Sequence, residues 1–209
     1  MIKGLLGGFT GRLGNVVGYY YRGVNVIRTI PRKRKGPGTP AQIEQRVKFG
    51  MAVKFLKPLA PFMNRIHGKC FKNMSGYNKL CSLNMKQIIT GAWPDFRIDY
   101  RQVRLTTGHL PGLRNVSIAL EKKSQVAVLW EAGPDHDYAL PTDQLYLAFF
   151  EEESKKWKVL ENIATRKDDR IVMDMVEYRC CRLQFYTGFI SENGIRVSNS
   201  QYLGMINII

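Results

Sequence analysis

The spacing of hydrophobic positions changes along the chain, and the change separates two kinds of predicted structure. Around residues 40–56, apolar side chains recur every four positions, as they do along one face of a helix. Beyond residue 95, short runs alternate apolar and polar positions, which is the spacing of half-buried strands. The pattern therefore predicts an α+β fold. The apolar positions of the helical face are Ile43, Val47, Met51 and Phe55.

The first thirty residues predict a β-hairpin. Glycines recur here too densely for a helix, because each interior glycine costs about 1 kcal/mol relative to alanine. Residues 15–21 and 24–30 are rich in Val, Ile and Tyr, and Arg22-Gly23 between them is placed for a tight turn with glycine at positive φ. Three consecutive tyrosines, residues 19–21, then place aromatic rings on both faces of the first strand.

A basic arm is predicted directly after the hairpin. Four consecutive cations lie between Pro31 and the Gly-Pro-Gly of residues 36–38, which break both helices and strands. Nothing in this segment can be buried, so we expect an exposed arm that becomes ordered only when it docks on a partner. The four cations are Arg32, Lys33, Arg34 and Lys35.

A helix is predicted to begin where the arm ends. Thr39 is placed as its N-cap, Pro40 occupies the first helical position, and Gln42 completes a capping box. The two prolines that follow residue 56 bend or end this helix.

A second helix is expected from about Ser75 to Thr90, with Gly91 placed to cap its C-terminus. We expect the two helices to pack as an antiparallel pair.

Seven strand-like runs separated by turn signals follow, which is typical of an antiparallel β-sandwich, although a small barrel would give the same pattern. Trp130 and Trp157 are expected core anchors, and residues 192–194 (Glu-Asn-Gly) predict a hairpin turn before the last strand. We expect a basic region over residues 1–94, a linker over 95–112 and the sandwich over 113–209. The predicted strands are residues 115–120, 125–131, 144–150, 156–160, 170–175, 182–190 and 195–205.

The charge of the chain is unevenly distributed. Residues 1–94 hold 17 lysines and arginines against the single acid Glu44, a net charge of +16, whereas residues 95–209 hold 15 against 16 acids, a net charge of −1. Sixteen unbalanced positive charges oppose compaction, so their presence indicates a polyanionic partner, either nucleic acid or an acidic protein surface. A solvated basic face that only aids solubility is the alternative. The candidate nucleic-acid-binding residues are Arg28, Arg32, Lys33, Arg34, Lys35, Arg46 and Lys48.

The sequence gives little support for catalysis, a metal or a cofactor. Neither common phosphate-binding glycine motif occurs. His67, Cys70 and Cys81 lack the paired spacing of structural zinc sites, and we expect Cys180-Cys181 to lie in a strand, where neighbours point to opposite faces. Residues 135–137 (Asp-His-Asp) are interpreted as a turn. We expect no catalytic residues, no metal, no cofactor and no small-molecule substrate.

Composition indicates a globular protein. Of 209 residues, 44% are apolar and 23% charged, no apolar run approaches the roughly 20 residues that cross a bilayer, and Arg12 interrupts any signal-like start. Four cysteines are too few and too oddly spaced for a disulfide scaffold. We therefore expect reduced thiols, no membrane partner, and a location in the cytoplasm or in a virion assembled there.

Three motifs of the chain occur together: the glycine-rich start over residues 4–18, Thr-Pro-Ala-Gln at 39–42 followed by Gln45-Arg46, and Val-Ser-Asn-Ser at 197–200 followed by Tyr-Leu-Gly at 202–204. In this combination the chain resembles an uncharacterised Bacteroidetes family of about this length, classed as a domain of unknown function. The resemblance covers nearly the whole chain and implies no activity, cofactor or catalytic residue. The segment from residue 39 also resembles phage-associated proteins, and the last strands resemble a fibronectin-type or immunoglobulin-like sandwich.

Two functional hypotheses follow. In the first, the chain is a non-enzymatic assembly or scaffold protein whose basic region docks on a polyanion, with nucleic acid favoured, while the sandwich contacts protein or a second copy. In the alternative, it is a phage-derived or virion structural component whose basic arm inserts into neighbouring acidic subunits. An enzyme is the least favoured class.

Overall fold

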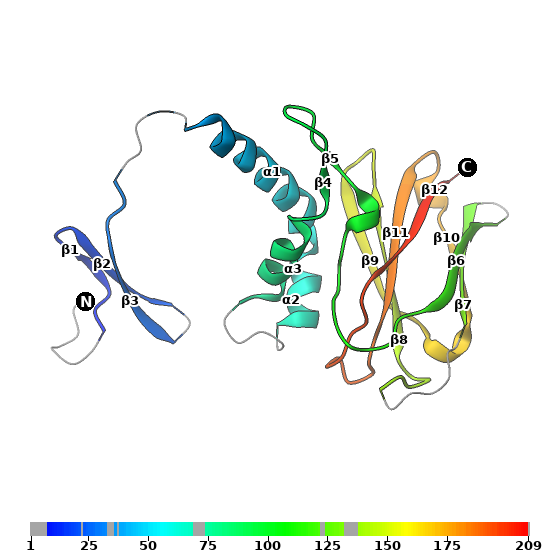
Figure 1. The fold of residues 1–209 in the computed structure, drawn as a ribbon. Helices are drawn as coiled ribbons and strands as arrows, with labels where there is room; N and C mark the ends of the chain where they lie inside the picture. The colour runs from blue at the N-terminus through cyan, green and yellow to red at the C-terminus, as the bar shows by residue number, and fades with distance from the viewer. Residues whose placement is uncertain are drawn as a thin grey trace. The chain divides into compact units, whose positions relative to one another are not determined.

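The computed structural model describes residues 8–21, 23–32, 36, 38–68, 74–121, 124–131 and 138–208 (Figure 1). The chain forms two compact units, Met1–Ile43 and Glu44–Ile209, whereas the sequence predicted divisions after residues 94 and 112. Among the helices that are described, none combines the length and apolar character needed to cross a membrane. Several residues discussed above lie outside the described ones: residues 4–7, Arg22, Lys33 to Lys35, Pro37, Cys70, and residues 135–137.

The first unit is a three-stranded antiparallel sheet in the order β1-β2-β3. Strands β2 and β3 form the predicted hairpin, and Gly23 adopts the expected positive φ, +86°, in the turn between them. Strand β1 was not predicted, because the glycines around it leave no run of strand-forming residues in the sequence. The bounds are β1 (Gly11–Leu13), β2 (Val16–Tyr21) and β3 (Val24–Thr29).

Helix α1 (Pro40–Leu56) begins and ends as predicted. The capping box is formed, because the backbone N–H of Gln42 donates to Thr39 Oγ1 and the backbone N–H of Thr39 donates to Gln42 Oε1, both at 3.4 Å. A short 3-10 turn, η1 (Lys57–Leu59), and helix α2 (Ala60–His67) continue the chain past the prolines.

The predicted second helix is correct at its start and wrong at its end. Helix α3 (Gly76–Asn84) is capped by Ser75, whose Oγ accepts from the backbone N–H of Asn78 at 3.2 Å. It ends at Asn84, whose side chain bonds both ways to the backbone of Arg104 at 2.8 Å. Residues 89–90 instead form β4 (Ile89–Thr90), which pairs with β5 (Arg97–Ile98), and Gly91 lies in their connection. Helix α3 packs chiefly against α2 rather than α1.

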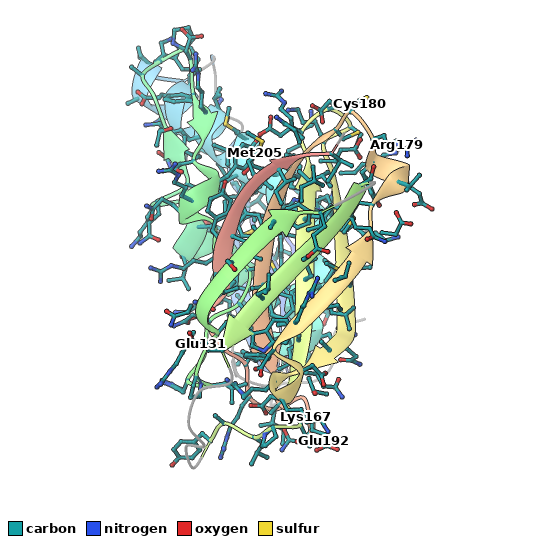
Figure 2. All side chains as sticks on the ribbon, turned by 90° about the vertical axis from the view of Figure 1, so that its right-hand side faces the viewer. Glu131, Lys167, Arg179, Cys180, Glu192 and Met205 are labelled. Carbon is teal, nitrogen blue, oxygen red and sulfur yellow. The ribbon has the colours of Figure 1, made fainter. Side chains whose placement is uncertain are left out.

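The remaining strands form the predicted antiparallel sandwich. One sheet has the order β10-β7-β6 and the other β12-β11-β8-β9. Figure 2 looks onto the sandwich from the three-stranded side, with Arg179 and Cys180 at one end and Lys167 and Glu192 at the other. The bounds are β6 (Arg114–Leu120), β7 (Gln125–Glu131), β8 (Gln144–Glu151), β9 (Lys156–Thr165), β10 (Arg170–Asp174), β11 (Arg182–Ile190) and β12 (Gln201–Asn207).

The last strand starts later than predicted. Residues 195–200 are not part of β12. Val197 and Ser198 form only isolated bridges, to Ile190 and Leu110 respectively. The predicted turn before them is formed, with Gly194 donating its backbone N–H to the Ser191 carbonyl oxygen at 2.7 Å.

The four-stranded sheet is buried on both faces, so the helices share a core with the sandwich. Along β8, Leu145, Leu147 and Phe149 point between the two sheets, while Tyr146, Ala148 and Phe150 pack on the opposite side with residues of the helices. This explains why β8 is almost continuously apolar. Trp130 is buried as predicted. Trp157 is half-buried on the helical side, where its Nε1 donates to the Phe55 carbonyl oxygen at 2.9 Å.

Candidate nucleic-acid interface

The register of the first unit places two arginines and two tyrosines on one face of its sheet. Arg12 pairs with Val17, and Val17 pairs with Arg28, so this row crosses all three strands. Side chains two residues apart on a strand point to the same side. Tyr19 and Tyr21 on β2 therefore share the face of Val17. We call Arg12, Arg28, Tyr19 and Tyr21 the Arg–Tyr face.

The groups of the Arg–Tyr face are accessible to a ligand. The guanidinium carbon of Arg28 lies 5.4 Å from the centre of the Tyr19 ring, within the range of a cation–π contact. Arg12 donates from Nε to the Gly14 carbonyl oxygen at 3.0 Å and is exposed. Tyr21 is 54% exposed. Guanidinium groups bind phosphate, and an exposed phenol ring offers a surface on which a base stacks.

The opposite face of the sheet carries Tyr20 and Ile27 beside the polar side chains Asn25 and Thr29. Phe9 lies against Gly18, where an added Cβ would come within 2.4 Å of the Phe9 carbonyl oxygen, so only glycine permits this approach. Tyr20 and Ile27, on the same side, are 65% and 63% exposed. Both faces therefore expose apolar side chains, and among the described residues of the three strands the arginines lie on the Arg–Tyr face only.

No acid balances the charge of the first unit. Residues 1–43 contain eight lysines and arginines and neither aspartate nor glutamate, a net charge of +8. Any carboxylate or phosphate that neutralises these cations must therefore come from outside the unit.

The predicted binding residues fall in both units. Arg28 lies on β3 within the Arg–Tyr face, and Arg32 is exposed just beyond it. Arg46 and Lys48 lie on α1 in the second unit. Lys48 forms an ion pair with Glu44 at 2.7 Å, and its Nζ lies 4.8 Å from the centre of the Phe96 ring. The charge of Lys48 is therefore partly balanced by a carboxylate.

Arg12 was not predicted as a binding residue. Its place next to Arg28 depends on β1, and the Gly14-Asn15 pair that follows was the available signal of a turn. Elsewhere in the basic region, Arg65 of α2 forms an ion pair with Glu161 of β9, so some of its positive charge is balanced by the later part of the chain.

The histidine and cysteine considered for metal binding lie in the helical core. His67 is buried, and its Nε2 accepts from the backbone N–H of Thr107 at 3.4 Å. Burial lowers the pKa of His67 and raises the pKa of the Cys81 thiol, so both groups favour their neutral forms.

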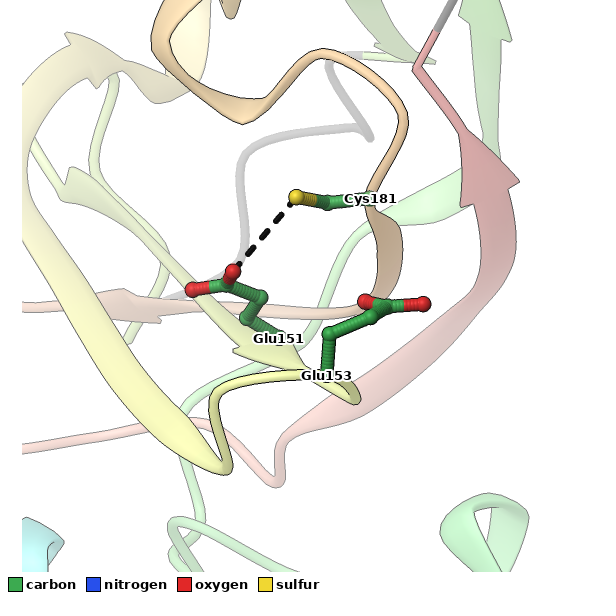
Figure 3. Close-up of side chains that lie close together, drawn as sticks. All are labelled: Glu151, Glu153 and Cys181. Carbon is green, nitrogen blue, oxygen red and sulfur yellow. Dashed lines mark hydrogen bonds between the residues drawn. The ribbon is translucent and has the colours of Figure 1, made fainter.

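The expectation that Cys180 and Cys181 lie in a strand is wrong. Cys180 has a φ of +62° in the turn before β11, with its backbone N–H bonded to the Ile208 carbonyl oxygen at 2.8 Å. Cys181 then lies beside Glu151 and Glu153 (Figure 3).

This Glu–Cys cluster is already internally bonded. Cys181 Sγ lies 3.4 Å from Glu151 Oε1. Desolvation and the neighbouring Glu151 carboxylate raise the pKa of the thiol, which keeps it protonated. Glu153 accepts from the backbone N–H and the Nε of Arg182 at 3.0 and 3.2 Å. The arrangement is that of a surface ion-pair network.

Comparisons with known proteins identify a family and a fold. Residues 8–204 match the model described as "Family of unknown function (DUF6266)". No curated protein matches the chain. The sandwich is similar to the fn3 domain of the human collagen alpha-1(XX) chain, with 9% identity, coverage of 49% of this chain and 89% of that chain, and a TM-score of 0.37. It is also similar to the fn3 domain of human contactin 1, with 8% identity, coverage of 50% and 77%, and a TM-score of 0.31. These similarities concern the fold alone, and the α+β assignment rests on the strand pairing described above.

Proposed function

We propose that this chain, which belongs to the family of unknown function DUF6266, is a non-enzymatic assembly or scaffold protein that docks on nucleic acid through its first unit. The Arg–Tyr face and the arm of residues 32–35 contact the polyanion, and the second unit contacts protein. The protein acts in the cytoplasm or in a virion, and the motif resemblance suggests a Bacteroidetes origin.

The observation that carries this proposal is the composition of the Arg–Tyr face. Two arginines and two tyrosines share one side of a sheet in a unit of charge +8 that contains no acid. An acidic protein surface would neutralise the arginines equally well. The tyrosines favour nucleic acid, because stacking of a base on an aromatic ring contributes about 1–3 kcal/mol. Contacts of this kind bind sequence-independently.

A salt titration tests the proposal on the full chain. Binding to a fluorescent single-stranded 30-mer, DNA or RNA, is expected to weaken linearly in log affinity against log salt. Five or more phosphate contacts give a slope of about −3.5 or steeper, since each contributes about −0.7 on single strands. Fluorescence anisotropy at a series of salt concentrations measures the slope. Absence of binding at about 50 mM salt would retire the proposal.

A second candidate function, that of a structural component that assembles with itself, is favoured by the exposed Tyr20 and Ile27 on the other side of the same sheet. Exposed apolar side chains in one patch mark contact surfaces. If Tyr20 and Ile27 mediate assembly, the chain forms an oligomer that resists high salt, and Ile27→Asp dissociates it. Mass photometry of the wild type and the variant checks this, with Val172→Asp, at an exposed apolar residue of the sandwich, as control. A monomeric wild type would exclude this candidate.

A further inference from the structure

An open groove in the second unit has an apolar floor and a cationic rim. It has a volume of about 750 Å³ and lies between α1 and the segment around β5. Phe55, Tyr100 and Phe150 form an aromatic cluster along it, with the Phe55 ring centre 4.9 Å from that of Phe150 and 6.0 Å from that of Tyr100. All the residues that line it belong to one compact unit. It is therefore a property of that unit alone.

Three exposed cations surround this floor: Lys54 on α1, Arg97 on β5 and Lys155 in the β8–β9 turn. None of the described residues that line the groove is acidic. Apolar contact at the centre with cations at the edge is complementary to a ligand that carries carboxylates beside apolar side chains.

Gly50 keeps the groove open. It lies in the interior of α1, where glycine costs about 1 kcal/mol relative to alanine. An added Cβ at Gly50 would meet no atom within 4 Å, so packing does not require glycine there. A side chain at this position would instead occupy the groove that Gly50 lines.

We propose that this groove binds a peptide segment of a partner protein in which acidic residues flank aliphatic or aromatic ones. The apolar side chains contact Phe55 and Phe150, and the carboxylates pair with Lys54, Arg97 and Lys155. The first unit of a second copy is excluded as occupant by its charge of +8, which the rim repels. This assignment rests on the proposed function, in which the second unit contacts protein, because it names the kind of peptide that this unit binds.

A peptide selection with the full chain tests the assignment. From a displayed library of random 12-residue peptides, we expect enrichment of sequences that combine Asp or Glu with Leu, Ile, Phe or Trp. Gly50→Leu is expected to abolish their binding by filling the groove, while Leu raises the helix propensity of α1. The double variant Lys54→Gln, Arg97→Gln is expected to weaken binding about tenfold, and Lys86→Gln, an exposed cation elsewhere, is expected to leave it unchanged.

Three results would overturn the assignment: no enriched peptide, enriched peptides without carboxylates, or binding that survives Gly50→Leu. A further result would also overturn it: dodecanoate binds the wild type and not Gly50→Leu, while no peptide is enriched. The ligand of the groove would then be an anionic amphiphile. Nucleic-acid binding measured on Gly50→Leu separates the two proposals, because the substitution lies outside the first unit. If Gly50→Leu retains nucleic-acid binding and loses peptide binding, both the proposed function and the groove assignment are supported.

Discussion

Replacing Arg28, Arg32, Lys33, Arg34 and Lys35 by glutamine is expected to lower the affinity of the full chain for a single-stranded 30-mer about a thousandfold at 0.1 M salt. Each phosphate contact contributes about −0.7 to the slope of log affinity against log salt, so loss of five contacts flattens that slope by about 3.5. Fluorescence anisotropy measures both quantities in one titration series.

A matched variant distinguishes contact from overall charge. Glutamine at five exposed cations of the second unit removes the same charge from elsewhere in the chain: Lys86, Arg114, Lys156, Lys158 and Lys167. We expect this control to keep most of the wild-type slope, since general attraction beyond about 10 Å is screened at 0.1 M salt. Equal losses in the two variants would show that nucleic acid responds to net charge and would exclude the basic first unit as its docking site.

Local signals were sufficient for most of the secondary structure. Strand β11 spans the predicted residues 182–190, because a run of strand-forming residues and the flanking turns define its ends within the segment itself. The start of α1 was also predictable, since the capping box joins only Thr39 and Gln42. Where one segment contains both partners of an interaction, the sequence determines the outcome.

The errors occur where a distant residue is the partner. At the end of α3, the side chain of Asn84 bonds to the backbone of Arg104, twenty positions away. Before β12, the Ser198 Oγ accepts from the backbone N–H of Phe189, and the Ser198 backbone bridges to Leu110. No spacing rule within residues 75–90 or 195–205 contains this information. The core that the helices share with the sandwich could not be predicted from local sequence either, because the side of β8 that packs on the helices is defined only in the assembled sheet.

The candidate site was predictable in composition but not in arrangement. The tyrosines and Arg28 were evident in the hairpin, and their neighbour Arg12 was not, because its position depends on pairing of β1 with β2. The arrangement of the groove was still less predictable from the sequence. Lys54, Arg97 and Lys155 come from three separated segments, and nothing in their local sequence brings them together.

The second large effect concerns stability and a buried ion pair of the sandwich. Arg166 and Asp143 are 6% and 0% exposed, with Arg166 Nη2 at 3.0 Å from Asp143 Oδ2. The guanidinium also donates to the Pro111 carbonyl oxygen at 2.8 Å and lies 4.0 Å from the centre of the Phe189 ring. Arg166→Met is expected to lower the free energy of unfolding of the second unit by about 3–5 kcal/mol, because it leaves the Asp143 carboxylate buried without a cation.

Urea denaturation followed by tryptophan fluorescence measures this loss, and all three tryptophans, Trp93, Trp130 and Trp157, lie in the second unit. Adding Asp143→Asn to Arg166→Met is expected to recover part of the lost stability, since the buried charge is then removed with its partner. Arg170, whose ion pair with Glu121 is exposed, provides the matched control, and Arg170→Met is expected to cost less than about 1 kcal/mol. Similar losses in the two single variants would show that burial of the Arg166 pair has no special energetic weight, and the sandwich would then rest on its apolar core alone.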